Sequence, residues 1–145
     1  MRQNEFLTKV VNITPGAMYD GKIIDQYVDV ELKNGTTLKF FDYACRVEKR
    51  MKGKKIKLSI TIQTAGKPIK TKNANYETSQ KFIRGRIVRL TSKLDGKEKL
   101  YSGVIDTKET KISFIYTNSS DLKKGDIVEY SNKDGFSFII TEATS

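Results

Sequence analysis

Nine stretches rich in Val, Ile, Thr, Tyr and Phe, each of strand length, follow one another at short intervals along the chain. They are 6–13, 23–32, 36–43, 55–63, 82–91, 98–106, 111–117, 126–131 and 136–142. A succession of strand-length runs with few helical segments between them is typical of β-barrels and β-sandwiches. The sequence therefore predicts an all-β fold.

The polar stretch TAGKPIKTKNANYETSQ, residues 64–80, separates the first four of these runs from the others. It is the least strand-like part of the sequence, and it predicts a boundary between two modules. We place a basic module at 1–66, a connector at 67–81 and a second module at 82–145. Modules of about 70 residues bury a smaller fraction of their surface than larger domains, so we expect the two to lean on each other.

Three turns carry Asn-Gly or Asp-Gly between apolar runs, a pattern that favours β-hairpins. They are Lys33-Asn34-Gly35, Leu94-Asp95-Gly96 and Lys133-Asp134-Gly135. In the first hairpin, residues that lie opposite each other must share one face of the sheet. A three-residue loop that ends at a left-handed Gly35 meets this condition. It pairs Val28 with Phe40 and Val30 with Leu38 on the inner face.

The third turn predicts a second hairpin, which includes the segment GFSFII near the C-terminus. In its register Tyr130 lies opposite Phe138, and Val128 lies opposite Ile140. Phe136, Phe138 and Ile140 then form one apolar face. Core packing explains this face without a ligand, so we interpret GFSFII mainly as a hairpin arm.

One short helix is predicted over residues 43–52, in the segment DYACRVEKRMKG. Asp42 is suited to cap its N-terminus, and Gly53 is suited to end it. Apolar side chains fall on one face at helical spacing, and Cys45 beside that face is predicted to be a small core residue. The face consists of Ala44, Val47 and Met51.

The net charge of +10 is unevenly distributed. Residues 1–73 contain 15 Lys and Arg against 7 Asp and Glu, whereas residues 74–145 contain 12 against 10. Seven of the basic residues lie between Arg46 and Lys57, where Glu48 is the single acidic residue. A basic surplus gathered in one half favours a surface that binds a polyanion. A solvated, lysine-rich surface is the alternative interpretation.

The chain contains no histidine and a single cysteine, Cys45. It therefore lacks the commonest general base and metal ligand, every Ser-His or Cys-His pair, and any intrachain disulfide or cysteine-based zinc site. No spacing of carboxylates indicates a paired-acid hydrolase, so we expect neither an enzyme nor a metal or other cofactor. No apolar run approaches the roughly 18 residues that cross a bilayer, and MRQNEFLTKVV has no apolar signal-peptide core. We expect a cytoplasmic protein without a membrane partner.

The second half contains GRIVRLTSKL, KLYSGVID, KISFIY, DLKKGDIVEYS and GFSFIITE. As five strands with a turn between the third and fourth, residues 82–142 resemble an OB-fold module of the cold-shock type. The resemblance implies a small barrel that binds single-stranded nucleic acid. Cold-shock proteins carry Gly-Phe-aromatic and Phe-x-His motifs on their second and third strands. Here those strands offer Tyr101, Phe114 and Tyr116, so the family's stacking residues do not carry over.

The first half has a similar layout, but its fifth strand is either missing or lies near Ile69 in the connector. We therefore expect two small OB-like barrels in tandem, with one short helix. A pair of SH3-like barrels or a single β-sandwich is the structural alternative.

The predicted function is non-catalytic binding of nucleic acid, single-stranded DNA or RNA rather than duplex. OB-like proteins hold single strands with aromatic side chains that stack on bases and with cations that follow the phosphates. The register of the first hairpin places Tyr27 beside Phe41 on the outer face, with Lys39 between them. The predicted contact residues are Tyr27, Lys39, Phe41, Arg46, Lys49, Arg50, Lys52, Lys54 and Lys55.

Two alternatives accompany this prediction. Tyr27 and Phe41 could pack against the second module instead of facing a ligand. At the level of function, the chain could be a protein-interaction or assembly module that binds an acidic protein surface and no nucleic acid.

Overall fold

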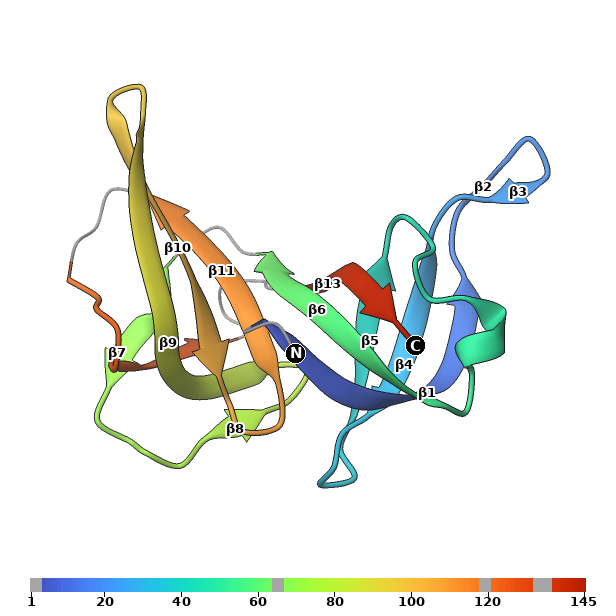
Figure 1. The fold of residues 1–145 in the computed structure, drawn as a ribbon, viewed down its shortest axis with the longest axis horizontal. Helices are drawn as coiled ribbons and strands as arrows, with labels where there is room; N and C mark the ends of the chain where they lie inside the picture. The colour runs from blue at the N-terminus through green and yellow to red at the C-terminus, as the bar shows by residue number, and fades with distance from the viewer. Residues whose placement is uncertain (1–3, 64–66, 118–120, 132–136) are drawn as a thin grey trace.

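The structure is a computed structural model, and it describes residues 4–63, 67–117, 121–131 and 137–145. The strands of the first part are β1 (Glu5–Pro15), β2 (Met18–Tyr19), β3 (Lys22–Ile23), β4 (Gln26–Glu31), β5 (Thr37–Asp42) and β6 (Lys55–Gln63). The others are β7 (Ile69–Thr71), β8 (Glu77–Thr78), β9 (Phe82–Asp95), β10 (Glu98–Asp106), β11 (Lys111–Thr117), β12 (Ile127–Ser131) and β13 (Ser137–Thr144). Within these ranges the helical structure is a single 3₁₀ turn, η1 (Lys49–Met51). The prediction of an all-β fold is confirmed (Figure 1).

Five of the strands close a barrel. β1 pairs with β4, β4 with β5, β5 with β13 and β13 with β6, and β6 returns to β1. All of these pairs are antiparallel except β5–β13, which is parallel. Side chains alternate between the inside and the outside of the barrel. The inner set includes Phe6, Phe40 and Phe138, and the ring centroid of Phe40 lies 6.4 Å from that of Phe6 and 5.5 Å from that of Phe138.

The inserted unit, residues 67–131, comes between β6 and β13 in the chain, although these two strands are neighbours in the barrel. Its strands follow the order β11–β10–β9–β12–β7, and β8 adds to β9. The long β9 has a bulge at Val88; its first part pairs with β12 and its second part with β10. The core of the unit includes three stacked rings. The centroid of Tyr116 lies 4.9 Å from that of Tyr101 and 6.0 Å from that of Phe114.

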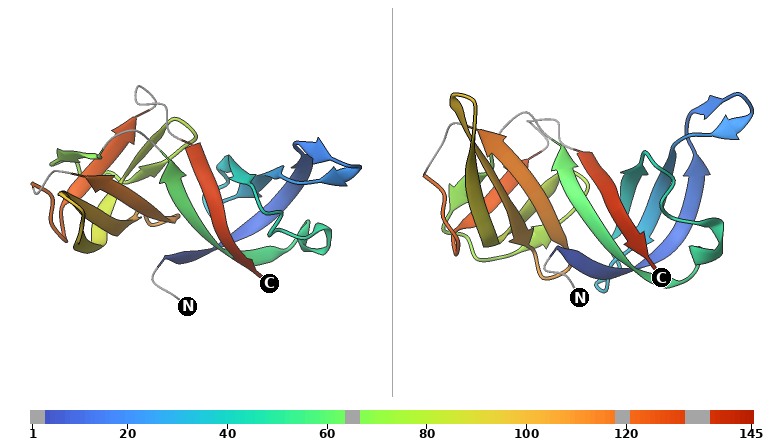
Figure 2. Two further views of the ribbon diagram at one scale, coloured as in Figure 1. Left: turned by 90° about the horizontal axis from the view of Figure 1, so that it is seen from above. Right: turned by 45° about the horizontal axis from the view of Figure 1, so that its top comes forward.

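Strand pairing and a side-chain amide fix the inserted unit against the barrel. β11 extends the sheet beyond β6 by parallel pairing, in which Ser113 is the partner of Thr61. The side-chain amide of Gln80 binds the backbone of Lys39: its Nε2 donates to the carbonyl oxygen (3.0 Å), and its Oε1 accepts from the N–H (2.7 Å). The sheet therefore runs without a break from β4 through β5, β13 and β6 to β11, and Figure 2 shows β6 and β13 between the two parts in both views.

The hairpin of β4 and β5 has the predicted register. Val28 pairs with Phe40 and Val30 with Leu38, and all four side chains are buried. Gly35 has a φ of +87°, the left-handed conformation that the three-residue loop requires. The rule that opposed residues share a face was therefore sufficient to choose the turn.

The predicted pairing of the last strand is wrong. Tyr130 does not lie opposite Phe138, because Tyr130 pairs with Ile83 and Phe138 pairs with Ile62. GFSFII is thus part of the strand that closes the barrel, and the boundaries placed at 1–66, 67–81 and 82–145 cut across a shared sheet. Residues 133–136, which include the predicted turn, lie outside the described residues.

The predicted helix over 43–52 is also wrong, because only Lys49–Met51 is helical and it forms a 3₁₀ turn. Cys45 has a φ of +51°, a left-handed conformation that is incompatible with an α-helix through this position. The carboxylate of Asp42 does cap the segment, since it accepts a hydrogen bond from the N–H of Arg46 at 2.9 Å. The capping residue was therefore predicted correctly, but a compact loop follows it.

The apolar residues assigned to that helix have different positions in the loop. Val47 and Met51 are buried and join the barrel core, whereas Ala44 is exposed. Cys45, which was expected in the core, is half-buried. Helical spacing thus identified two core residues although the backbone that carries them is not an α-helix.

The small hairpin of β2 and β3 was not predicted. Met18 pairs with Ile23, and the turn consists of Asp20 and Gly21, with φ values of +51° and +75°. Two positive φ values are typical of a type I′ turn, for which Asp-Gly is a preferred sequence. The hairpin projects from the barrel between β1 and β4 (Figure 1).

Replacing Gly35 by Ala should lower the free energy of unfolding by about 1 kcal/mol, because a side chain is disfavoured at this φ. No heavy atom lies within 4 Å of the added Cβ, so the cost comes from the backbone conformation alone. Urea unfolding measures it. Lys33→Ala in the same loop is the control, with an expected change within about 0.5 kcal/mol. Equal changes in the two variants would contradict the assigned turn.

Candidate functional site

Two aromatic rings and a lysine share the outer face of β4 and β5. Tyr27 pairs with Phe41 across the strands, and their ring centroids lie 5.3 Å apart at an interplanar angle of 44°. The Nζ atom of Lys39 lies 6.0 Å from the centroid of the Tyr27 ring. Tyr27 is 42% exposed, and Phe41 is half-buried. The outward placement predicted for this group is therefore confirmed.

The aromatic pair begins a longer row of outward side chains. Phe41 is the parallel partner of Ile139, Ile139 pairs with Thr61, and Thr61 pairs with Ser113. Together with Tyr27 they cross five adjacent strands, β4, β5, β13, β6 and β11. Neighbouring strands are about 4.8 Å apart, so the row measures about 19 Å along the curved surface of the sheet.

Beside this row, the surface between the barrel and the inserted unit is hollowed. We call this hollow the outer groove; it has a volume of about 590 Å³. It is lined by Phe41, Tyr43, Thr61, Ile62, Gln63, Ile115, Ile139 and Thr141. None of these side chains is charged at neutral pH, although the chain has 27 Lys and Arg. The outer groove therefore offers apolar surface, hydroxyl groups and one amide.

The basic residues predicted for the site form two groups. Arg46 lies close to the outer groove, since its Cζ is 6.0 Å from the centroid of the Tyr43 ring. Beyond η1 the loop runs along β1, where the N–H of Gly53 donates to the carbonyl of Val10 at 2.7 Å. This second part of the loop carries its cations along β1, on another side of the barrel from the row.

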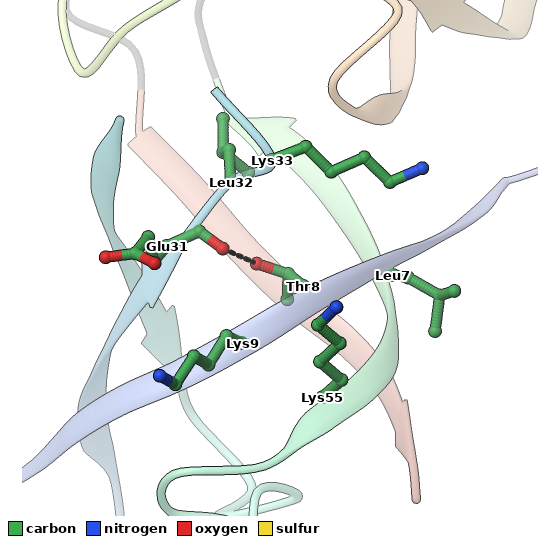
Figure 3. Close-up of a pocket in the computed structure, with 7 residues that line it drawn as sticks. All are labelled: Leu7, Thr8, Lys9, Glu31, Leu32, Lys33 and Lys55. Atoms are coloured by element: carbon green, nitrogen blue, oxygen red, sulfur yellow. Dashed lines mark hydrogen bonds between the residues drawn. The ribbon is translucent and has the colours of Figure 1, made fainter. Parts of the chain in front are cut away.

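Lys55 lines a separate pocket of about 250 Å³. The other lining residues are Leu7, Thr8, Lys9, Glu31, Leu32 and Lys33. In Figure 3 the ammonium groups of Lys9, Lys33 and Lys55 point in different directions. The drawn hydrogen bond joins the Thr8 hydroxyl to the Glu31 carbonyl at 3.0 Å (Figure 3). Tight phosphate binding requires donors that converge on one anion, and the three lysines do not.

The structure thus gathers four of the nine predicted contact residues at the outer face and groove: Tyr27, Lys39, Phe41 and Arg46. The remaining five lie along the loop and the start of β6: Lys49, Arg50, Lys52, Lys54 and Lys55. Arg50 also has an acidic neighbour, because its Nε lies 2.6 Å from Oε2 of Glu48.

A buried carboxylate holds the loop that carries Tyr43 and Arg46. Asp42 accepts hydrogen bonds from the N–H groups of Arg46 (2.9 Å) and Val47 (2.8 Å), and from Nε2 of Gln26 (2.9 Å). The same Nε2 donates to the carbonyl of Val47 at 2.8 Å. Asp42 and Gln26 are both buried. This network joins the start of β4 to the end of β5 and fixes the direction in which the loop leaves the sheet.

Cys45 lies in the same loop and is half-buried. Its burial, together with the carboxylates of Asp42 and Asp25, raises the pKa of its thiol. A raised pKa means that the thiol stays protonated at neutral pH, and the protonated form is a poor nucleophile.

Two arginines of the inserted unit are engaged within that unit. Arg84 donates from Nε to Glu129 at 2.9 Å and from Nη1 to the carbonyl of Asn75 at 3.1 Å. Arg86 donates from Nε to the hydroxyl of Tyr76 at 2.8 Å. These side chains hold the strands and the connector together, so a substitution at either position would perturb the fold as well as the charge.

No protein-family model matches the chain, and comparison with curated proteins gave no significant match. Within the described ranges, no group of three or more His, Cys, Asp and Glu side chains could hold a metal ion. The part of the chain that the structure describes also has no helix of the length and apolarity needed to span a membrane. The geometry of the outer face is therefore the basis for a functional assignment.

Of the eight residues that line the outer groove, seven were not predicted as part of a site, and Tyr43, Ile115 and Ile139 are among them. Tyr43 was assigned to the helix, and Ile139 was assigned to a hairpin with the preceding strand. Ile115 alternates with the core residues Phe114 and Tyr116, so the sequence already indicated that it points outward. The pairing of β11 with β6, which brings Ile115 to the groove, had no local signal.

Replacing Asp42 by Ala should lower the free energy of unfolding by about 2 kcal/mol, because the partners of its buried carboxylate lose their acceptor. Chemical denaturation measures the loss, and hydrogen exchange should become faster at the amide of Val47. Asp29→Ala, at an outward position of the same hairpin, should change stability by less than about 0.5 kcal/mol. An Asp42→Ala protein as stable as the parent would contradict the role of this network.

Proposed function

We propose that the protein binds single-stranded nucleic acid, without catalysis, on the outer face of β4 and β5. The observation that carries the proposal is the exposed ring of Tyr27 beside Phe41, with the ammonium group of Lys39 6.0 Å from the Tyr27 ring. Proteins that bind single strands combine aromatic platforms for the bases with cations for the backbone. This outer face offers both on two neighbouring strands.

The strand order of the barrel supports the proposal. Numbered within the barrel, the strands are joined in the circular order first, second, third, fifth, fourth, with the third and fifth parallel. This arrangement resembles the five-stranded Greek-key barrel of OB-folds, in which the second and third strands carry the binding face. The strands in those places here are β4 and β5. This order is formed by residues 5–63 and 137–144 and not by residues 82–142, because β13, which was expected to be the fifth strand of the second module, closes the barrel beside β6.

The energies of such contacts are large enough to matter. Base stacking on an aromatic side chain contributes about 1–3 kcal/mol per base. Two rings would therefore supply about 2–6 kcal/mol before any phosphate contact, and this part releases no counterions. The phosphate contacts fall to Lys39 and Arg46, each placed beside an aromatic ring, in a chain of net charge +10. Their contribution should fall as the salt concentration rises.

A second candidate function is protein assembly through the β2–β3 hairpin. Three large apolar side chains of this hairpin are at least about half exposed: Met18, Tyr19 and Ile24. A projecting hairpin with exposed apolar side chains on both sides of its turn is typical of a surface that contacts another protein. Such binding would depend little on salt, in contrast to a phosphate-dominated interaction.

Fluorescence anisotropy with short oligo-dT and oligo-U at about 50 mM and 200 mM salt tests the proposed function. Phe41→Ala should weaken binding about equally at both salt concentrations, because stacking releases no counterions. The Lys39→Gln, Arg46→Gln double variant should weaken binding at low salt and reduce the salt slope by about one unit for each phosphate that is no longer neutralised.

The matched controls lie on the exposed tip of the β9–β10 hairpin. Lys93→Gln with Lys97→Gln removes the same charge from the inserted unit, and Leu94→Ala truncates a side chain that is 76% exposed. Both should bind oligonucleotides as the parent does. Failure of the parent protein to bind either oligonucleotide at low salt would contradict the proposal and favour protein assembly.

A further inference from the structure

The outer groove is built by both parts of the molecule. Phe41 comes from the end of β5 and Tyr43 from the loop that follows it, whereas Ile139 comes from β13 and Ile115 from β11 of the inserted unit. Ile115 is 52% exposed. The barrel and the inserted unit therefore each contribute one wall of the groove. Phe41 belongs both to the groove and to the row of outward side chains.

The position of the inserted wall is fixed in the folded protein. β11 is hydrogen-bonded to β6 where Ser113 pairs with Thr61, and the amide of Gln80 binds both backbone polar groups of Lys39. These contacts join β11 to β6, and they join the segment before β9 to β5. A preformed site costs less to occupy than one that must be ordered during binding.

The lining of the groove favours bases over phosphates. A phosphodiester needs cationic partners, and among the described residues that line the groove there is no Lys or Arg. A base can place its face on apolar side chains and its edge on hydroxyl or amide groups, as single-stranded recognition commonly does. Thr61, Gln63 and Thr141 supply such polar groups beside Ile115 and Ile139. The volume of about 590 Å³ lies within the range of about 300–1,000 Å³ that small-molecule sites occupy.

We propose that the outer groove binds bases of the same nucleic-acid strand, so that the strand passes from Tyr27 and Phe41 on the barrel to Ile115 on the inserted unit. This inference rests on the proposed function and extends it: the insertion between β6 and β13 makes the second wall of the site. The phosphates remain outside the groove, near Lys39 and Arg46.

Tryptophan fluorescence provides a direct test, because the chain contains no tryptophan. Ile115→Trp places a single indole on the inserted wall, and stacking of a base on that ring should quench its emission. Ile69→Trp on β7 is the matched control: Ile69 is 62% exposed, belongs to the same unit and does not line the groove. Saturating oligo-dT should lower the emission of the Ile115→Trp variant at least twofold and leave that of the Ile69→Trp variant unchanged.

Truncation gives an independent readout in the anisotropy assay. Ile115→Ala should weaken binding of an oligo-dT of about 10 nucleotides roughly fivefold, while oligonucleotides of about 3 nucleotides, which cover only the barrel rings, should be unaffected. Phe41→Ala should weaken binding of both lengths. Ile69→Ala should change neither.

The outcomes separate the inference from the proposed function. A different pattern would overturn the two-part groove: binding is lost in Phe41→Ala, but the oligonucleotide neither quenches Ile115→Trp nor binds Ile115→Ala in a length-dependent, weaker way. The outer groove would then be a site for a protein segment. The proposed function would then still stand. Absence of any oligonucleotide binding by the parent protein would overturn both.

Discussion

The structure depends on the insertion of β13 between β5 and β6. Without this strand, the barrel would have two unpaired edges, and the core would lose Phe138 and Ile140, which are almost fully buried. Unpaired edges are costly when buried and promote aggregation when exposed. β13 follows the inserted unit in the sequence. The barrel is therefore complete only when strands from both sides of that unit have come together. The same strand places Ile139 in the outer row, so barrel closure and site formation are one event.

Local sequence signals were sufficient for the nine longer strands and for the first hairpin, but not for the short strands β2, β3, β7 and β8. Alternation of apolar side chains and the position of Gly35 determined the register of β4 and β5, and with it the outward placement of Tyr27 and Phe41. These features depend on neighbours a few residues away, which is why the sequence contains them. The Asp20-Gly21 turn carried the same kind of signal and was overlooked.

Features that depend on distant partners were not predictable in this way. Phe138 and Ile140 alternate equally well against β12 or β6, so their pattern does not identify the strand that receives them. The loop after β5 has helical spacing, but Asp42 and Gln26 hold it in another conformation from within the barrel. Predicting the outer groove would have required knowing both the loop conformation and the pairing of β13, because Tyr43 comes from the loop and Ile139 from the closing strand. Placing Ile115 in the groove would also have required the pairing of β11 with β6.

The basic residues and the aromatic side chains, which the sequence analysis assigned to one contact surface, lie mostly on different parts of the molecule. The densest basic segment, residues 46–57, follows the loop toward β1. There Arg50 forms an ion pair with Glu48, and the ammonium group of Lys55 points in a different direction from those of the nearby lysines (Figure 3). At the outer face two cations lie beside aromatic rings, Lys39 by Tyr27 and Arg46 by Tyr43. A ligand held there would owe its orientation to stacking, while the net charge of +10 would raise its rate of encounter. The remaining lysines would act on association at a distance and not as specific contacts.

The central claim is that a single strand lies across the outer row, from β4 to β11. Backbone amide chemical shifts of ¹⁵N-labelled protein, followed while oligo-dT is added to saturation, test it most directly. The account predicts the largest shift changes at Tyr27, Phe41 and Ile139, continuing to Ile115 on the inserted unit, with small changes along Lys49–Met51 and beyond. Shift changes confined to the basic loop, with an unperturbed outer row, would contradict it.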